Sequence, residues 1–115
     1  FAKTTNFLLG VVPKGGDDMQ TYVTLWKYTK DGLVDMKNTP NRYETVKKII
    51  SDAGGKLVSI YGLIGEYDVV TIIEMPDEKV AASTILKICS KGRITSQTMT
   101  ALSIEDFLNI AKEIS

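Results

Sequence analysis

The side chains best suited to chemistry lie in and around one short segment, Gly65-Glu66-Tyr67-Asp68, which separates two apolar runs. A carboxylate such as Asp68 can accept a proton or bind an amine, and Tyr61 lies a few residues upstream. We interpret Asp68 and Tyr61 as the candidate catalytic residues, at the mouth of a cleft between a sheet and its helices. The alternative is structural, with Gly65 adopting a positive φ in a turn and Asp68 accepting a hydrogen bond from a nearby backbone amide.

Two further residues suggest a binding site. Arg42 follows Pro40 in the first turn of a predicted helix, where the helix dipole disfavours a cation. That position predicts an ion pair with a carboxylate such as Glu66 or Asp68, or an anionic ligand. Trp26 either lines a pocket for a flat molecule or packs in the core. The candidate ligand-binding residues are Trp26, Arg42, Tyr61, Glu66, Tyr67 and Asp68.

Composition excludes several classes of function. The 115 residues include 14 basic and 14 acidic side chains, one cysteine and no histidine. The absence of histidine removes His-based triads, and a lone cysteine cannot form an intramolecular disulfide or a cysteine zinc cluster. Zero net charge argues against nucleic acid as a partner. We therefore expect no metal and no cofactor.

The chain is expected to be a single cytoplasmic domain. It has no apolar run of eighteen residues that could span a membrane, and a single unpaired cysteine suits a reducing compartment. Residues 1–18 differ in character from the rest, and Met19 opens a clean strand pattern. We expect residues 1–18 to be an added segment or a native extension, and residues 19–115 to form the domain.

Periodicity predicts the order of the elements. Residues rich in β-branched and aromatic types, or alternating in polarity, predict strands over 20–27, 56–63, 67–75 and 93–102. Apolar stripes at helical spacing predict helices over 39–53, 77–90 and 103–114. Thr39, Asp77 and Ser103 are the predicted N-caps. The resulting order, βαββαβ followed by a helix, is the α+β, ferredoxin-like arrangement of an antiparallel sheet with two helices on one face.

The strands are apolar on both faces, although a lone domain of this type covers only one. In the first strand Val23 and Leu25 share one face, while Tyr22, Thr24 and Trp26 share the other. The uncovered face requires a cover, because an exposed apolar sheet is unfavourable in water. Either the last helix folds across it, or a second copy of the chain pairs with it in a dimeric α/β barrel. In the second case we place Trp26 in the interface.

The segment Gly65-Glu66-Tyr67-Asp68, together with Thr39-Pro40-Asn41-Arg42 and Gly54-Gly55-Lys56, resembles the GYD-domain family of small, mostly prokaryotic proteins. The similarity runs over nearly the whole chain from Met19. It implies a homodimer or larger homo-oligomer of paired sheets, but no established reaction or ligand. The sequence therefore favours a homo-oligomeric module that binds a small molecule or supports an assembly. The alternative is a small cofactor-free enzyme, of monooxygenase or isomerase type, that uses Asp68 and Tyr61.

Overall fold

The structure, a computed structural model, describes residues 18–114, so most of the predicted segment 1–18 lies outside the described residues. Nine elements follow one another within these described residues. They are β1 (Gln20–Tyr28), α1 (Lys30–Val34), the 3-10 helix η2 (Met36–Asn38), α2 (Thr39–Asp52), β2 (Lys56–Gly62), β3 (Val69–Met75), α3 (Glu78–Cys89), β4 (Ile94–Ala101) and α4 (Ile104–Lys112).

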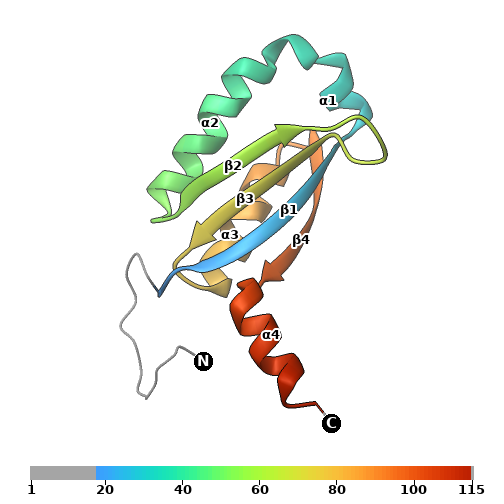
Figure 1. Cartoon of the computed structure of the whole chain (residues 1–115). Helices are drawn as coiled ribbons and strands as arrows, with labels where there is room; N and C mark the ends of the chain where they lie inside the picture. Colours follow the sequence, from blue (N-terminus) through green and yellow to red (C-terminus); the bar gives the residue numbers. More distant parts are fainter. Residues whose placement is uncertain (1–17, 115) are drawn as a thin grey trace.

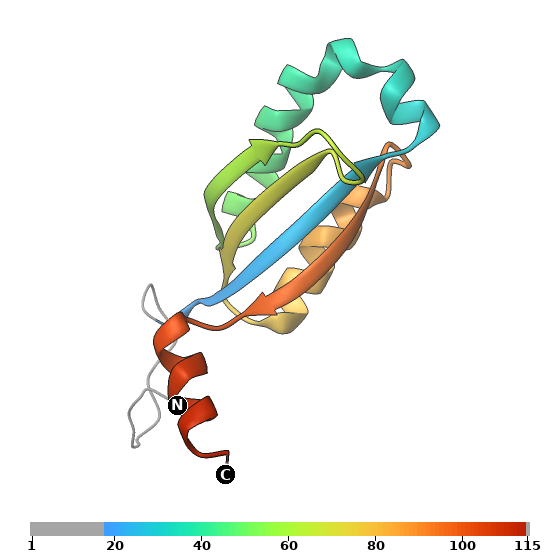
Figure 2. The same cartoon turned by 45° about the vertical axis from the view of Figure 1, so that its right-hand side comes forward.

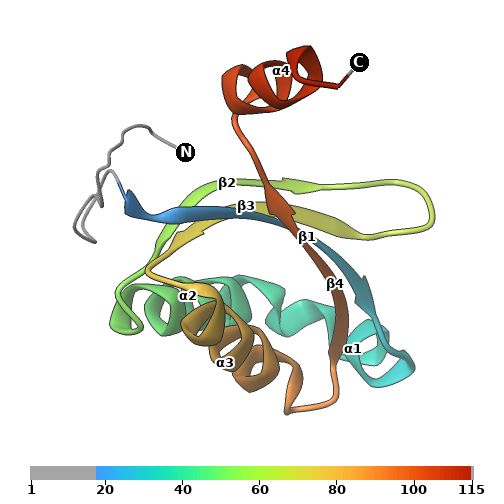
Figure 3. The same ribbon diagram turned by 90° about the horizontal axis from the view of Figure 1, so that it is seen from below.

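The four strands form one antiparallel sheet in the order β2-β3-β1-β4 (Figure 1). Helices α2 and α3 lie on the same side of this sheet, and the opposite side is left open (Figure 3). The predicted α+β, ferredoxin-like arrangement is therefore confirmed. The central strands β3 and β1 lie between the edge strands β2 and β4. Because β1 pairs antiparallel with β3, the C-terminal end of β1 lies beside the β2–β3 hairpin.

Side-chain caps begin two of the helices as the sequence predicted. The Asp77 carboxylate accepts a hydrogen bond from the Val80 amide at 2.9 Å, and the Ser103 hydroxyl accepts one from the Asp106 amide at 3.0 Å. The prediction of Thr39 as the N-cap of α2 was wrong, because η2 runs directly into the helix and Asn38 takes the N-cap position without a side-chain bond. No helix within residues 18–114 is both long and apolar enough to cross a membrane.

The core lies between the sheet and the two helices, and it contains the two aromatic residues of β1. Tyr22 and Trp26 are each 3% exposed and pack in one buried cluster with Ile50 of α2 and Ile85 of α3. The Trp26 indole N–H donates to the Thr71 hydroxyl at 3.0 Å, so its polar atom is satisfied. Placing Trp26 in an interface between two sheets was therefore wrong.

The open face of the sheet carries the other side chains of each strand. Strand register aligns two rows across it, because residues paired directly in an antiparallel sheet share a face. One row joins Ile72 to Val23 and Met99, and the next joins Val70 to Leu25 and Gln97. Tyr61 of β2 pairs with Val70 and extends the second row. We call the apolar members of these rows the open-face cluster: Val23, Leu25, Tyr61, Val70, Ile72 and Met99.

The last helix does not cover the open face. Figure 3 shows α4 on the open side of the sheet but standing clear of it, and Figure 2 shows it running beyond the end of β4. Its large apolar side chains are all exposed, from 51% for Leu108 to 71% for Ile104. The sequence left two possible covers for this face, the last helix or a second copy of the chain. The last helix does not fold over the sheet in the structure.

Candidate functional site

A cavity of about 730 Å³ lies between the sheet and the helices, at the end of the sheet where β1 stops. The sheet supplies its floor, while α2, α3 and the segment containing η2 supply its walls. The helix-facing side chains Trp26, Val69 and Ile60 lie on the floor. Val46 and Ile49 line it from α2, because they belong to the inward stripe of that helix. The site is thus built on rigid elements and is largely apolar inside.

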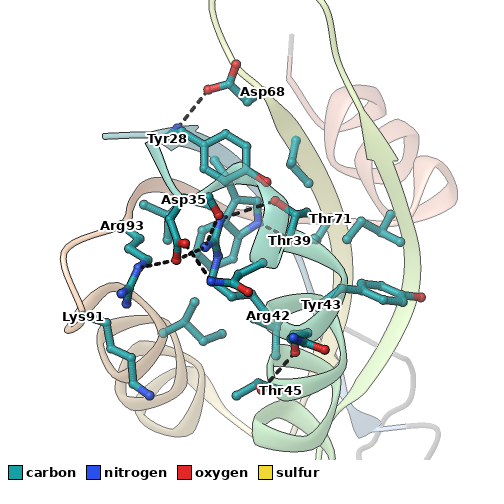
Figure 4. Close-up of a pocket in the computed structure, with 18 of the residues that line it drawn as sticks. Tyr28, Asp35, Thr39, Arg42, Tyr43, Thr45, Asp68, Thr71, Lys91 and Arg93 are labelled. Carbon is teal, nitrogen blue, oxygen red and sulfur yellow. Dashed lines mark hydrogen bonds and ion pairs between the residues drawn. The ribbon is translucent and has the colours of Figure 1, made fainter. Parts of the chain in front are cut away.

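A shared carboxylate organises the rim of the cavity (Figure 4). Asp35 Oδ2 accepts a hydrogen bond from Arg42 at 3.0 Å and forms an ion pair with Arg93, whose Nε lies 3.2 Å away. Arg42 also donates to the Asp35 carbonyl at 2.9 Å and to the Thr39 hydroxyl at 3.3 Å. Two arginines from distant parts of the chain therefore converge on one acid, which leaves this part of the rim with a surplus of positive charge.

Asp68 also lies on the rim and is held by the end of β1. Its carboxylate accepts from the Tyr28 amide at 2.8 Å. Its own amide donates to the Trp26 carbonyl at 2.8 Å, and its carbonyl accepts from the Leu63 amide at 2.8 Å. This agrees with the structural interpretation of Asp68, in which it bonds a nearby backbone amide and fixes the hairpin.

The structure brings three of the predicted site residues together and separates the others. Trp26, Arg42 and Asp68 all line the cavity. Tyr61 is 63% exposed and belongs to the open-face cluster. Tyr67 donates from its hydroxyl to Gln97 Oε1 at 2.6 Å, and Glu66 is exposed in the hairpin loop.

The structure does not bring the two predicted catalytic residues, Asp68 and Tyr61, together. Asp68 lines the cavity on the helix side, whereas Tyr61 lies on the other side of the sheet. The Asp68 carboxylate is also occupied by a backbone amide. Among residues 18–114 no three acidic or cysteine side chains gather where they could hold a metal ion.

Sequence reasoning missed two residues of the rim, Asp35 and Arg93. It paired Arg42 with Glu66 or Asp68, whereas the structure pairs it with Asp35, seven residues earlier in the chain. A signal was present in that spacing, because a carboxylate just before a helix is well placed to meet a cation in its first turn. Arg93 gave no comparable signal, since it reaches Asp35 only through the pairing of β4 with β1.

Similar folds occur among solved regulatory proteins of Mycobacterium tuberculosis. The leucine response regulatory protein LrpA matches with a TM-score of 0.55 at 13% identity, over 73% of this chain and 51% of the regulator. The feast or famine regulatory protein, solved with L-methionine, matches with a TM-score of 0.58 at 12% identity, over 85% and 60%. The chain spans little more than half of each regulator. At these identities the likeness concerns the fold alone.

Sequence comparison gives a closer relationship. A curated protein of Thermus thermophilus, named "Glutamine synthetase and cystathionine beta-lyase binding protein", is 29% identical over 91 residues, which cover 78% of this chain and 96% of that protein. The GYD domain model matches residues 22–111, from the first strand to the last helix. This range includes the hairpin segment that carries Tyr67 and Asp68. The chain therefore belongs to the GYD domain family.

Proposed function

We propose that this protein is a cytoplasmic, homo-oligomeric binding module, in which the open faces of two sheets pack together and the assembly binds a protein partner. The observation that carries the proposal is the open-face cluster. Its side chains lie in adjacent registers over all four strands, and the helices of the same chain cover only the opposite side. An apolar surface of this extent on a sheet is typical of an interface.

A second copy is the occupant that fits this face best. Helix α4 of the same chain stands clear of it and exposes Phe107 and Leu108. In a two-fold dimer each surface meets its own equivalent, so one apolar face supplies both halves of the contact. An α4 that projects past its own sheet is also placed to reach a neighbouring copy.

Oligomeric state tests this part of the proposal. Light scattering after gel filtration should give at least twice the chain mass for the wild type and the monomer mass for Leu25→Glu, because the substitution buries a charge between the sheets. Leu86→Glu is the matched control, since Leu86 is 70% exposed on α3, on the covered side of the sheet. An oligomeric Leu25→Glu protein, or a monomeric wild type, contradicts sheet-to-sheet pairing.

The protein partner is proposed from the relative rather than from a surface of this chain. The Thermus thermophilus protein is named for binding glutamine synthetase and cystathionine beta-lyase, and the match covers 96% of its length. We propose a partner of the same kind, a metabolic enzyme. Purified glutamine synthetase and cystathionine beta-lyase, passed over the immobilised full chain, should bind in at least one case. Failure of both contradicts the choice of partner and leaves the oligomer unaffected.

A further inference from the structure

The cavity on the helix side of the sheet takes no part in the proposed pairing of two sheets. It lies opposite the open-face cluster, so a second copy on that cluster leaves it accessible. Its volume, about 730 Å³, is in the range of small-molecule sites. The polarity of its walls and the charge of its rim together indicate which class of molecule would bind there.

The interior around Trp26 favours an apolar group. Its side chains come from strands and helices that meet around the indole of Trp26, and the indole N–H is already bonded to Thr71. A polar group placed there would lose its hydrogen bonds to water without compensation. The apolar lining residues that surround this space are Val46, Ile49, Ile60, Val69, Ile88 and Ile94.

The rim, by contrast, favours an anion. Four basic side chains line the cavity against two acidic ones, Asp35 and Asp68, and both acids already hold protein donors. Arg93 uses only its Nε atom, on Asp35, and its terminal nitrogens make no hydrogen bond within residues 18–114. A guanidinium with free terminal N–H groups is suited to a carboxylate. Lys91 lies on the same part of the rim (Figure 4).

We propose that this cavity binds an amphipathic monocarboxylate, with its apolar body against Trp26 and its carboxylate at the rim on Arg93. The chain has a single tryptophan, and that residue lines the site. Its fluorescence therefore reports occupancy directly. Sodium decanoate and decanol form a suitable pair of probes, because they share the apolar body and differ in the charged head.

Decanoate should change the Trp26 emission saturably, and its affinity should exceed that of decanol by about tenfold, the effect of one charge-assisted hydrogen bond. Arg93→Gln should remove this difference by weakening decanoate alone. Lys79→Gln, an exposed charge on α3 outside the cavity, is the matched control and should change neither affinity. Added salt should weaken decanoate more than decanol.

Filling the cavity tests the location independently. Val46→Phe should weaken both probes at least tenfold, with urea unfolding used to verify that the protein is folded; Ile49→Phe replaces it if the first variant is unfolded. Binding should persist in Leu25→Glu, which separates this proposal from the oligomer. Equal affinities for the two probes, an unchanged decanoate affinity in Arg93→Gln, or no saturable change at all would overturn the proposal.

Discussion

The Asp68 carboxylate lies 2.8 Å from the Tyr28 amide nitrogen and accepts its hydrogen bond, at the point where β1 ends. The Asp68 amide donates to the Trp26 carbonyl in the same place. One residue thus supplies two consecutive bonds to β1, one from its backbone and one from its side chain. The hairpin is thereby fixed to the central strand just beyond the last paired residues of β3.

Removing this carboxylate should destabilise the protein. Asp68→Ala leaves the Tyr28 amide without its acceptor, and we expect the free energy of unfolding to fall by about 1–3 kcal/mol and the melting temperature by several degrees. Asp68→Asn keeps an acceptor oxygen and should lose less. Glu66→Ala, in the same loop and exposed, is the control. A melting temperature in Asp68→Ala equal to that of the control would show that the bond contributes nothing.

Gly32 is required for a close approach between two backbones. A Cβ atom there would overlap the Arg93 carbonyl oxygen, which also accepts from the Thr29 amide at 3.1 Å. Gly32→Ala should therefore displace the start of β4 and destabilise the fold by about 1–3 kcal/mol. Gly62→Ala is the matched control, because a Cβ at Gly62 meets no atom within 4 Å. Equal urea midpoints for the two variants would contradict this.

The bond between Trp26 and Thr71 should appear as a coupling energy. Both residues are buried, and Trp26→Phe leaves the Thr71 hydroxyl without its hydrogen-bond donor. We expect Trp26→Phe and Thr71→Val to be less than additive in urea unfolding, with a coupling of about 1 kcal/mol. Additive losses would mean that the indole N–H contributes no net stability. Trp26→Glu should prevent folding rather than produce a folded monomer, because it places an unpaired charge in the buried core.

Stability should fall at alkaline pH through Tyr22. Burial raises the pKa of its phenol above the ordinary value of about 10, and the carboxylates of Glu78 and Asp77 raise it further. The unfolded chain then releases this proton at lower pH than the folded chain. The free energy of unfolding is therefore fully retained below about pH 10 and decreases as the pH rises through the folded pKa.

Tyr22→Phe should flatten this dependence when urea unfolding is measured between pH 9 and 11, a range set by that reference pKa of about 10. Tyr43→Phe is the control, because Tyr43 is an exposed tyrosine of α2 and lies outside the open-face cluster. An identical slope in the wild type and Tyr22→Phe would mean that other groups cause the alkaline loss.

Helix α4 should contribute to the proposed oligomer. Phe107→Glu places a charge on its exposed apolar stripe and should shift dissociation to higher protein concentration, measured by sedimentation at several dilutions. Asn109→Glu adds the same charge at a polar position of α4 and should leave dissociation unchanged. If the two variants dissociate alike, α4 does not take part.

The order of elements could be predicted because local signals were strong. Asp77 and Ser103 cap their helices as expected, since a side-chain cap depends only on residues within one turn. Thr39 failed as a cap because the preceding η2 already supplies a helical entry, which nothing at Thr39 itself reveals.

Which face of the sheet meets the helices could not be predicted. Alternation separated Tyr22 and Trp26 from Val23 and Leu25 correctly, but both sets are apolar enough to be buried. The approach of Arg93 to Asp35 could not be predicted either. It depends on the pairing of β4 with β1, which is a tertiary contact, whereas the spacing of Arg42 and Asp35 carried a local signal.

The isolation of α4 has a consequence for local cooperativity. A nine-residue helix gains too little from its own hydrogen bonds to be stable in water without packing, and every described side chain of α4 is exposed. Its Ser103 cap offsets only part of that deficit. Amide hydrogens of α4 should therefore exchange with solvent far faster than those of β1 in dilute protein, and slow down only when another surface covers the stripe.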